Sequence, residues 1–171
     1  ALVDRVADQP NIRVLNAAVA AQSSQGTYHR YNLPDANSLR PATGLHELFP
    51  GLRLLETVPV ETLAINELVK SIDLEGQQNN RLVIDLPGLE SEVFLALEAG
   101  DSLHLFNRIE LVAGREALYE GSMGAAELRD WLASHGFDLI DDDASEDPDL
   151  PRFLFRRNDL ALEVRDLRLQ V

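Results

Sequence analysis

The sequence contains no cysteine, and it contains no apolar run long enough to cross a membrane. The absence of thiols excludes disulfides, thiolate metal ligands and cysteine nucleophiles, and it is typical of a reducing compartment. A membrane-spanning helix needs about 20 consecutive apolar residues, and no basic-then-apolar signal pattern opens the chain. We therefore expect a cytoplasmic protein with no membrane segment.

Positive charge is also scarce, with 15 Lys and Arg residues against 29 Asp and Glu residues and a formal net charge of −14. A field of this sign repels phosphate polymers and anionic lipid surfaces, so nucleic-acid binding and membrane binding are both disfavoured. The 171 residues, of which 45% are hydrophobic and 26% charged, fit one globular domain.

The sequence offers no recognisable metal-binding pattern. The four histidines are His29, His46, His104 and His135, and no two of them form an H-x-x-x-H spacing. The acidic run at 141–149 lacks the central glycine and distal glutamate of a calcium-binding loop. We therefore expect no metal site, and we interpret the acidic run as a solvated loop.

Short apolar runs alternate with amphipathic segments along most of the chain. Strands are expected at 11–20, 27–32, 52–60, 82–86, 108–113, 137–140 and 153–156, and helices at 61–72, 90–98 and 125–135. This alternation predicts an α/β fold with a mixed, largely parallel sheet and helices on its faces. The last segment, 159–171, places four apolar residues at spacings of four, three and four, which is typical of a helix or the start of a coiled coil. A helix or strand that packs on its own domain is the alternative.

Four segments occur in a characteristic order: VLNAAV at 14–19, VPVETL at 58–63, LVIDLPGLE at 82–90, and IE at 109–110 followed by YEG, LRDWL and HGF up to residue 137. Together they resemble the FkbM family of S-adenosylmethionine-dependent methyltransferases. The third segment is similar to the family's L-K-I-D-V-E-G-A-E signature. Asp85, Gly88 and Glu90 match that signature, while Val83 and Pro87 replace its lysine and first glutamate.

The resemblance implies a truncated Rossmann-like class I methyltransferase fold over residues 1–158. Family members methylate a hydroxyl on a glycan or small molecule, and they hold S-adenosylmethionine at the carboxyl ends of parallel strands. The Gly-rich turn and the ribose-binding acid of such folds have no counterpart before Asn11. We therefore expect the later part of an O-methyltransferase, inactive as this chain and unable to bind the cofactor. The alternative is a non-catalytic, methyltransferase-like binding or assembly module.

The same comparison bears on assembly. In the full fold, two further strands separate the strand at 11–20 from the strand at 82–86. Without them, either these two strands pair directly or an apolar edge remains unpaired, and exposed edges recruit partners. The sequence therefore predicts a homodimer or a complex with a protein partner.

Three carboxylates are candidates for catalysis. Asp85 ends a strand that we expect to be buried, and burial would raise its pKa and favour base behaviour, although it could instead cap the following turn. Glu90 opens the next helix, where a capping role is favoured over a place in the cleft. Glu110 shares a strand face with Val112 and is either a second cleft carboxylate or a solvated residue.

Overall fold

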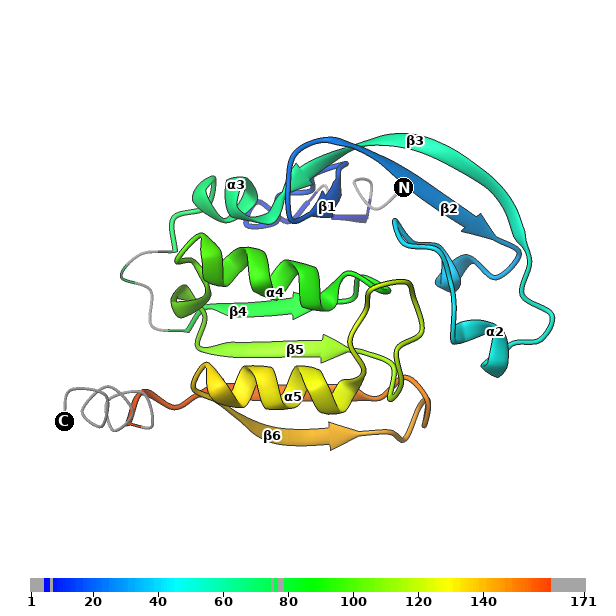
Figure 1. Cartoon of the computed structure of the whole chain (residues 1–171). Helices are drawn as coiled ribbons and strands as arrows, with labels where there is room; N and C mark the ends of the chain where they lie inside the picture. The colour runs from blue at the N-terminus through cyan, green and yellow to red at the C-terminus, as the bar shows by residue number, and fades with distance from the viewer. Residues whose placement is uncertain (1–4, 7, 75, 77–78, 161–171) are drawn as a thin grey trace.

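The computed structural model describes residues 5–6, 8–74, 76 and 79–160 and shows an α/β architecture with two mixed sheets (Figure 1). One sheet contains β1 (Ala18–Ala20), β2 (Gln25–Tyr31) and β3 (Leu54–Ala64). The other contains β4 (Arg81–Ile84), β5 (Arg108–Val112), β6 (Phe137–Asp143) and β7 (Arg152–Arg157). The helices are η1 (Pro34–Ala36), α2 (Leu45–Leu48), α3 (Ile65–Lys70), α4 (Glu90–Ala99), η2 (Leu103–Leu105) and α5 (Ala125–Ser134).

The four-stranded sheet has the order β4-β5-β7-β6. β4 and β5 are parallel and are connected through α4, whereas β7 runs antiparallel to both of its neighbours. A parallel neighbour requires a crossover such as α4, while β6 and β7 need only the acidic loop between them. The carboxyl ends of β4 and β5 therefore lie at the same edge of the sheet.

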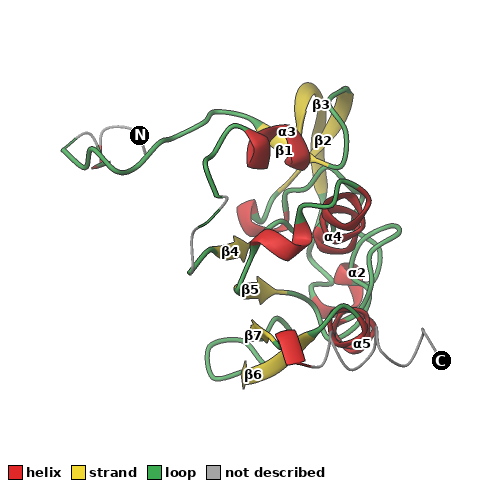
Figure 2. Ribbon diagram, turned by 90° about the vertical axis from the view of Figure 1, so that its left-hand side faces the viewer, coloured by secondary structure: helices red, strands yellow, loops and turns green. Residues whose placement is uncertain are grey.

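Helices α4 and α5 lie on the same face of this sheet (Figure 2). Strand alternation directs the side chains of Ile84, Ile109 and Phe155 to that face, where they join the main hydrophobic core. Both helices contribute to that core, with Val93, Phe94 and Leu97 from α4 and Leu128 and Leu132 from α5. The helix face is thus dry, and the opposite face carries polar side chains.

The three-stranded sheet has the order β1-β3-β2, with β1 parallel and β2 antiparallel to β3. Thr62 of β3 holds the turn before β2, because its hydroxyl donates to the Gln22 carbonyl at 2.8 Å and accepts from the Ser24 N–H at 3.0 Å. A second, smaller core lies beside this sheet and packs the segment 31–52 against residues 118 and 119.

Several expectations about these elements were wrong in detail. The sheets are not mostly parallel, since two of their five strand pairings are parallel and three are antiparallel. The helix expected at 61–72 is only Ile65–Lys70, because residues up to Ala64 pair with β1 as strand. The strand expected at 11–20 shrinks to Ala18–Ala20, since Ile12 and Leu15 find no core and stay 46% and 41% exposed.

The acidic run also differs from expectation. Its first three aspartates extend β6, and Asp143 lies opposite Arg152 of β7, where opposite charges support pairing. The apolar seam expected at 159–171 lies outside the described residues beyond Leu160. Among the helices that the structure describes, none is long and apolar enough to cross a membrane.

Candidate functional site

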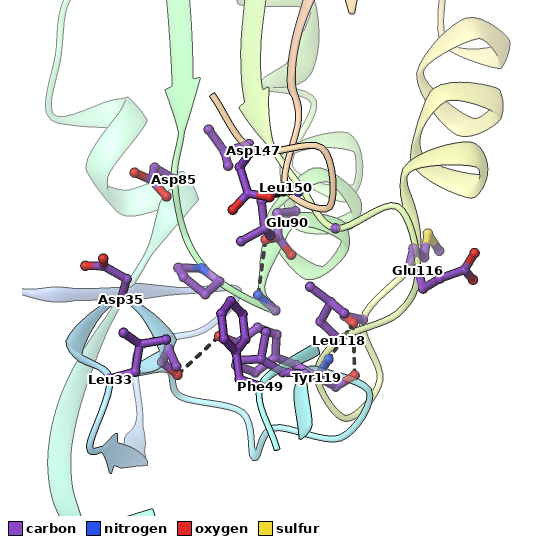
Figure 3. Close-up of a pocket in the computed structure, with 18 residues that line it drawn as sticks. Leu33, Asp35, Phe49, Asp85, Glu90, Glu116, Leu118, Tyr119, Asp147 and Leu150 are labelled. Carbon is purple, nitrogen blue, oxygen red and sulfur yellow. Dashed lines mark hydrogen bonds between the residues drawn. The ribbon is translucent and has the colours of Figure 1, made fainter. Parts of the chain in front are cut away.

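A cavity of about 330 Å³ opens at the carboxyl ends of β4 and β5 (Figure 3). Four segments line it, and they lie within residues 33–49, 85–90, 112–123 and 147–150. In open α/β sheets, ligands bind beyond the carboxyl ends of parallel strands. The cavity therefore occupies the position where the fold is suited to binding.

The turn after β4 forms one wall. Gly88 has a φ of +80°, and a Cβ atom built on it would lie 2.5 Å from the Cβ atom of Tyr119. Only glycine combines this backbone conformation with this close approach. The hydroxyl of Ser38 donates to the Pro87 carbonyl, which joins the turn to the segment between η1 and α2.

The loop after β5 forms the opposite wall. Leu118 is bound to the segment before α2, because its carbonyl accepts the N–H groups of Thr43 at 2.9 Å and Leu45 at 3.2 Å. The buried Tyr119 donates its hydroxyl to the Ala36 carbonyl at 3.1 Å. Burial, together with the charge of Glu90, raises the pKa of Tyr119, so this phenol stays protonated at neutral pH.

Glu90 is the first residue of α4 and lines the cavity with only 6% of its surface exposed. Burial raises the pKa of this carboxyl from 4.5 to about 7, the neighbouring charge of Asp85 adds to the shift, and backbone N–H groups of Glu90 and Gly88 oppose it. The Gly88 N–H donates to Glu90 Oε1 at 3.1 Å. Glu90 thus anchors the preceding turn and also reaches the cavity.

Asp85 lines the same cavity but is exposed. The expectation of a buried aspartate was wrong because β4 is the last strand of its sheet and Asp85 lies beyond the strand end, away from the helices. The structure therefore brings Asp85 and Glu90 together and assigns the burial to Glu90.

Glu110 does not line the cavity. Its two carboxylate oxygens accept hydrogen bonds from Arg81 of β4 and Arg152 of β7, the strands on either side. The residue is 9% exposed and lies on the sheet face opposite the helices. Glu110 is thus neither a cleft carboxylate nor a solvated residue, but the centre of an ion-paired cluster.

Sequence patterns did not identify Tyr119 or three further acids that line the cavity, Asp35, Glu116 and Asp147. Each lies in a loop with no periodic pattern, and only the fold brings these loops together. Within the described part of the chain, no group of three or more His, Asp or Glu side chains is arranged to hold a metal ion.

Comparison with known proteins identifies no relative of this chain. No protein-family model, curated protein or solved structure matches the chain. The chemistry of the site therefore has to be argued from its own residues. The buried carboxyl of Glu90, whose pKa is raised to about 7, and the apolar wall beside it suit proton exchange with a bound hydroxyl group.

The close contact at Gly88 can be tested with two matched substitutions. Gly88→Ala and Gly121→Ala both place a side chain at positive φ, which costs about 1 kcal/mol, but nothing lies within 4 Å of a Cβ atom at Gly121. Gly88→Ala should cost about 1–3 kcal/mol more because Tyr119 must move. Urea unfolding measures the free energy of unfolding of both variants. Equal losses of stability would refute the contact between Gly88 and Tyr119.

The burial of Glu90 predicts a pH-dependent stability. Because the folded-state pKa is raised from 4.5 to about 7, the folded protein holds the proton more tightly, and stability falls as the pH rises through this window. Glu90→Gln should remove that loss, which is about 3 kcal/mol. Chemical unfolding at pH 5 and pH 8 should therefore show that the free energy of unfolding of Glu90→Gln exceeds that of the wild type mainly at pH 8.

The control for this experiment is Glu120→Gln, which removes the same charge from an exposed position. It should follow the wild-type pH dependence. A Glu90→Gln variant with an unchanged advantage at both pH values would contradict the buried, proton-binding carboxyl.

Proposed function

We propose that the chain forms the acceptor side of an FkbM-type S-adenosylmethionine-dependent O-methyltransferase and binds a hydroxyl-bearing small molecule or glycan in the cavity. The observation that carries this proposal is the convergence of Asp85, Gly88 and Glu90, the three positions that match the family's signature, on one cavity. The β4-α4-β5 unit supports a truncated Rossmann-like fold, since βαβ units build such folds.

The chemistry that these residues can supply is positioning and proton transfer. Methyl transfer to an alcohol requires an aligned hydroxyl oxygen and usually a nearby base. With a pKa of about 7, Glu90 is ionised in a substantial fraction of molecules at neutral pH and can accept the hydroxyl proton. Tyr119 is already committed to the Ala36 carbonyl and acts as a wall.

The cofactor does not fit the residues present. Of the four segments that line the cavity, the one after β4 contains Pro87 and Gly88, and Tyr119 fills the space next to that glycine. No described residue supplies the Gly-rich turn that lets a backbone approach a nucleotide cofactor. We therefore assign this chain acceptor binding without methyl transfer.

S-adenosylmethionine titrated into this chain should give no binding heat in a calorimeter, because no described residue supplies the Gly-rich turn that would bind it. The protein's fold should be confirmed in the same sample by circular dichroism. Binding in the micromolar range would overturn the assignment of acceptor binding alone.

A second candidate function, a non-catalytic assembly module, is favoured by the edge of β4, which pairs with only one strand among the described residues. β4 ends its sheet, β1 pairs with β3 and not with β4, and Val83 is 54% exposed. Two copies that pair antiparallel about Val83 would set Arg81 of each opposite Asp85 of the other. Apolar and opposite-charge pairs of this kind support strand addition.

This candidate predicts a homodimer in solution. Multi-angle light scattering at high micromolar concentration should give twice the mass of the chain, and Val83→Lys should shift it to the monomer by placing like charges at the axis. Glu120→Lys, an exposed change of similar size, is the control and should stay dimeric. A clean wild-type monomer would remove the idea.

A further inference from the structure

All the charged side chains that line the cavity at the ends of β4 and β5 are acidic. Five of its lining residues are carboxylates, and none is Arg, Lys or His. They are Asp35, Asp85, Glu90, Glu116 and Asp147. They come from all four lining segments, and Figure 3 labels each of the five.

None of these five carboxylates has an ion-pair partner among the described residues. Elsewhere in the molecule, the buried Glu110 pairs with Arg81 and Arg152, and the half-buried Glu92 pairs with Arg40. Two of the cavity acids accept backbone N–H groups, Glu90 from Gly88 and Asp147 from Asp149 and Leu150. Hydrogen bonds from neutral donors leave the negative charge uncompensated.

Glu90 is the independent sign that the charge serves a ligand. It is more than nine-tenths buried, it reaches the cavity from the start of α4, and no cationic side chain neutralises it. Burial of an unpaired carboxylate costs free energy, so such residues cluster at functional sites. A ligand that reaches Glu90 with a hydrogen-bond donor would offset part of that cost.

The remaining wall is apolar. Leu33, Phe49, Leu118, Met123 and Leu150 line the cavity between the carboxylates. Pockets for small molecules are mostly apolar, with a few polar groups that orient the ligand. A simple metal ion would leave these side chains without a partner, whereas an organic cation would bury them.

We propose that the ligand of this cavity is an amphipathic organic cation, in which a protonated amine is carried on an apolar body. This inference rests on the proposed function, which requires the same ligand to carry a hydroxyl group as well. The exposed carboxylates of Asp35, Asp85 and Glu116 and the half-buried one of Asp147 make the opening negative and attract the amine there. Glu90, deeper in the cavity, meets the hydroxyl.

Three probes of one shape test the charge of the ligand. They are trans-4-aminocyclohexanol, trans-cyclohexane-1,4-diol and trans-4-hydroxycyclohexanecarboxylate, which are cationic, neutral and anionic at pH 8. Titrations followed by NMR should show the amine binding at least 10-fold more tightly than the diol at low salt, and the carboxylate more weakly than both. The preference for the amine should shrink at high salt because the opening is solvated.

A pair of double variants locates the effect. Asp35→Asn with Asp147→Asn should reduce the preference for the amine over the diol several-fold while leaving the affinity for the diol unchanged. Asp130→Asn with Glu120→Gln removes the same total charge at exposed positions that do not line the cavity, and it should keep the preference. An equal loss in both double variants would show a general field effect and overturn the inference.

The outcomes separate this inference from the proposed function. If the diol binds in the cavity as tightly as the amine, the cationic ligand is refuted and the acceptor pocket stands. If none of the three probes shifts the signals of Leu118, Tyr119 or Met123 at millimolar concentration, both are refuted. The expected order, with the amine tightest and sensitive to the cavity variants, supports both.

Discussion

The contact between Gly88 and Tyr119 is the constraint on which the candidate site depends. It brings the turn after β4 and the loop after β5 within van der Waals distance, and it requires a residue without a Cβ atom at positive φ. Through its hydroxyl, Tyr119 also binds the segment around Ala36. Three parts of the chain far apart in sequence therefore form one wall because a single side chain packs against a bare backbone.

Charge is distributed unevenly over this acidic protein. On the open face of the four-stranded sheet, arginines of neighbouring strands neutralise Glu110, so that carboxylate stabilises the sheet. At the carboxyl edge of the same sheet, the residues that line the cavity include five carboxylates and no arginine. Glu110 thus stabilises the sheet, whereas the cavity carboxylates are available to a ligand. The difference lies in their partners rather than in the chemistry of the carboxylate itself.

The free edge of β4 and the cavity are close neighbours. Asp85 directly follows β4 and also lines the cavity, so a strand added to that edge would lie beside the binding site. Assembly and ligand binding would then be linked, because a partner at β4 would change the surroundings of an exposed carboxylate. The two candidate functions are therefore compatible in one molecule.

The sequence by itself determined what depends on neighbours along the chain. Apolar periodicity located every strand and the helices α4 and α5, and the Pro87-Gly88 pair marked the sharp turn after β4. The sequence also named Asp85 and Glu90 as candidate site residues, and both line the cavity. These features follow from local backbone preferences and side-chain alternation, which short segments encode.

Only the tertiary structure decided which carboxylate is buried, which is ion-paired and which loops meet. Glu110 looked equivalent to Asp85 until the register placed Arg81 and Arg152 beside it, and the strand that ends at Asp85 proved to be an edge. No sequence pattern placed Tyr119 in the site, because its role comes from a glycine 31 positions earlier in the chain. Burial and charge compensation are set by contacts between distant segments, and no local pattern records them.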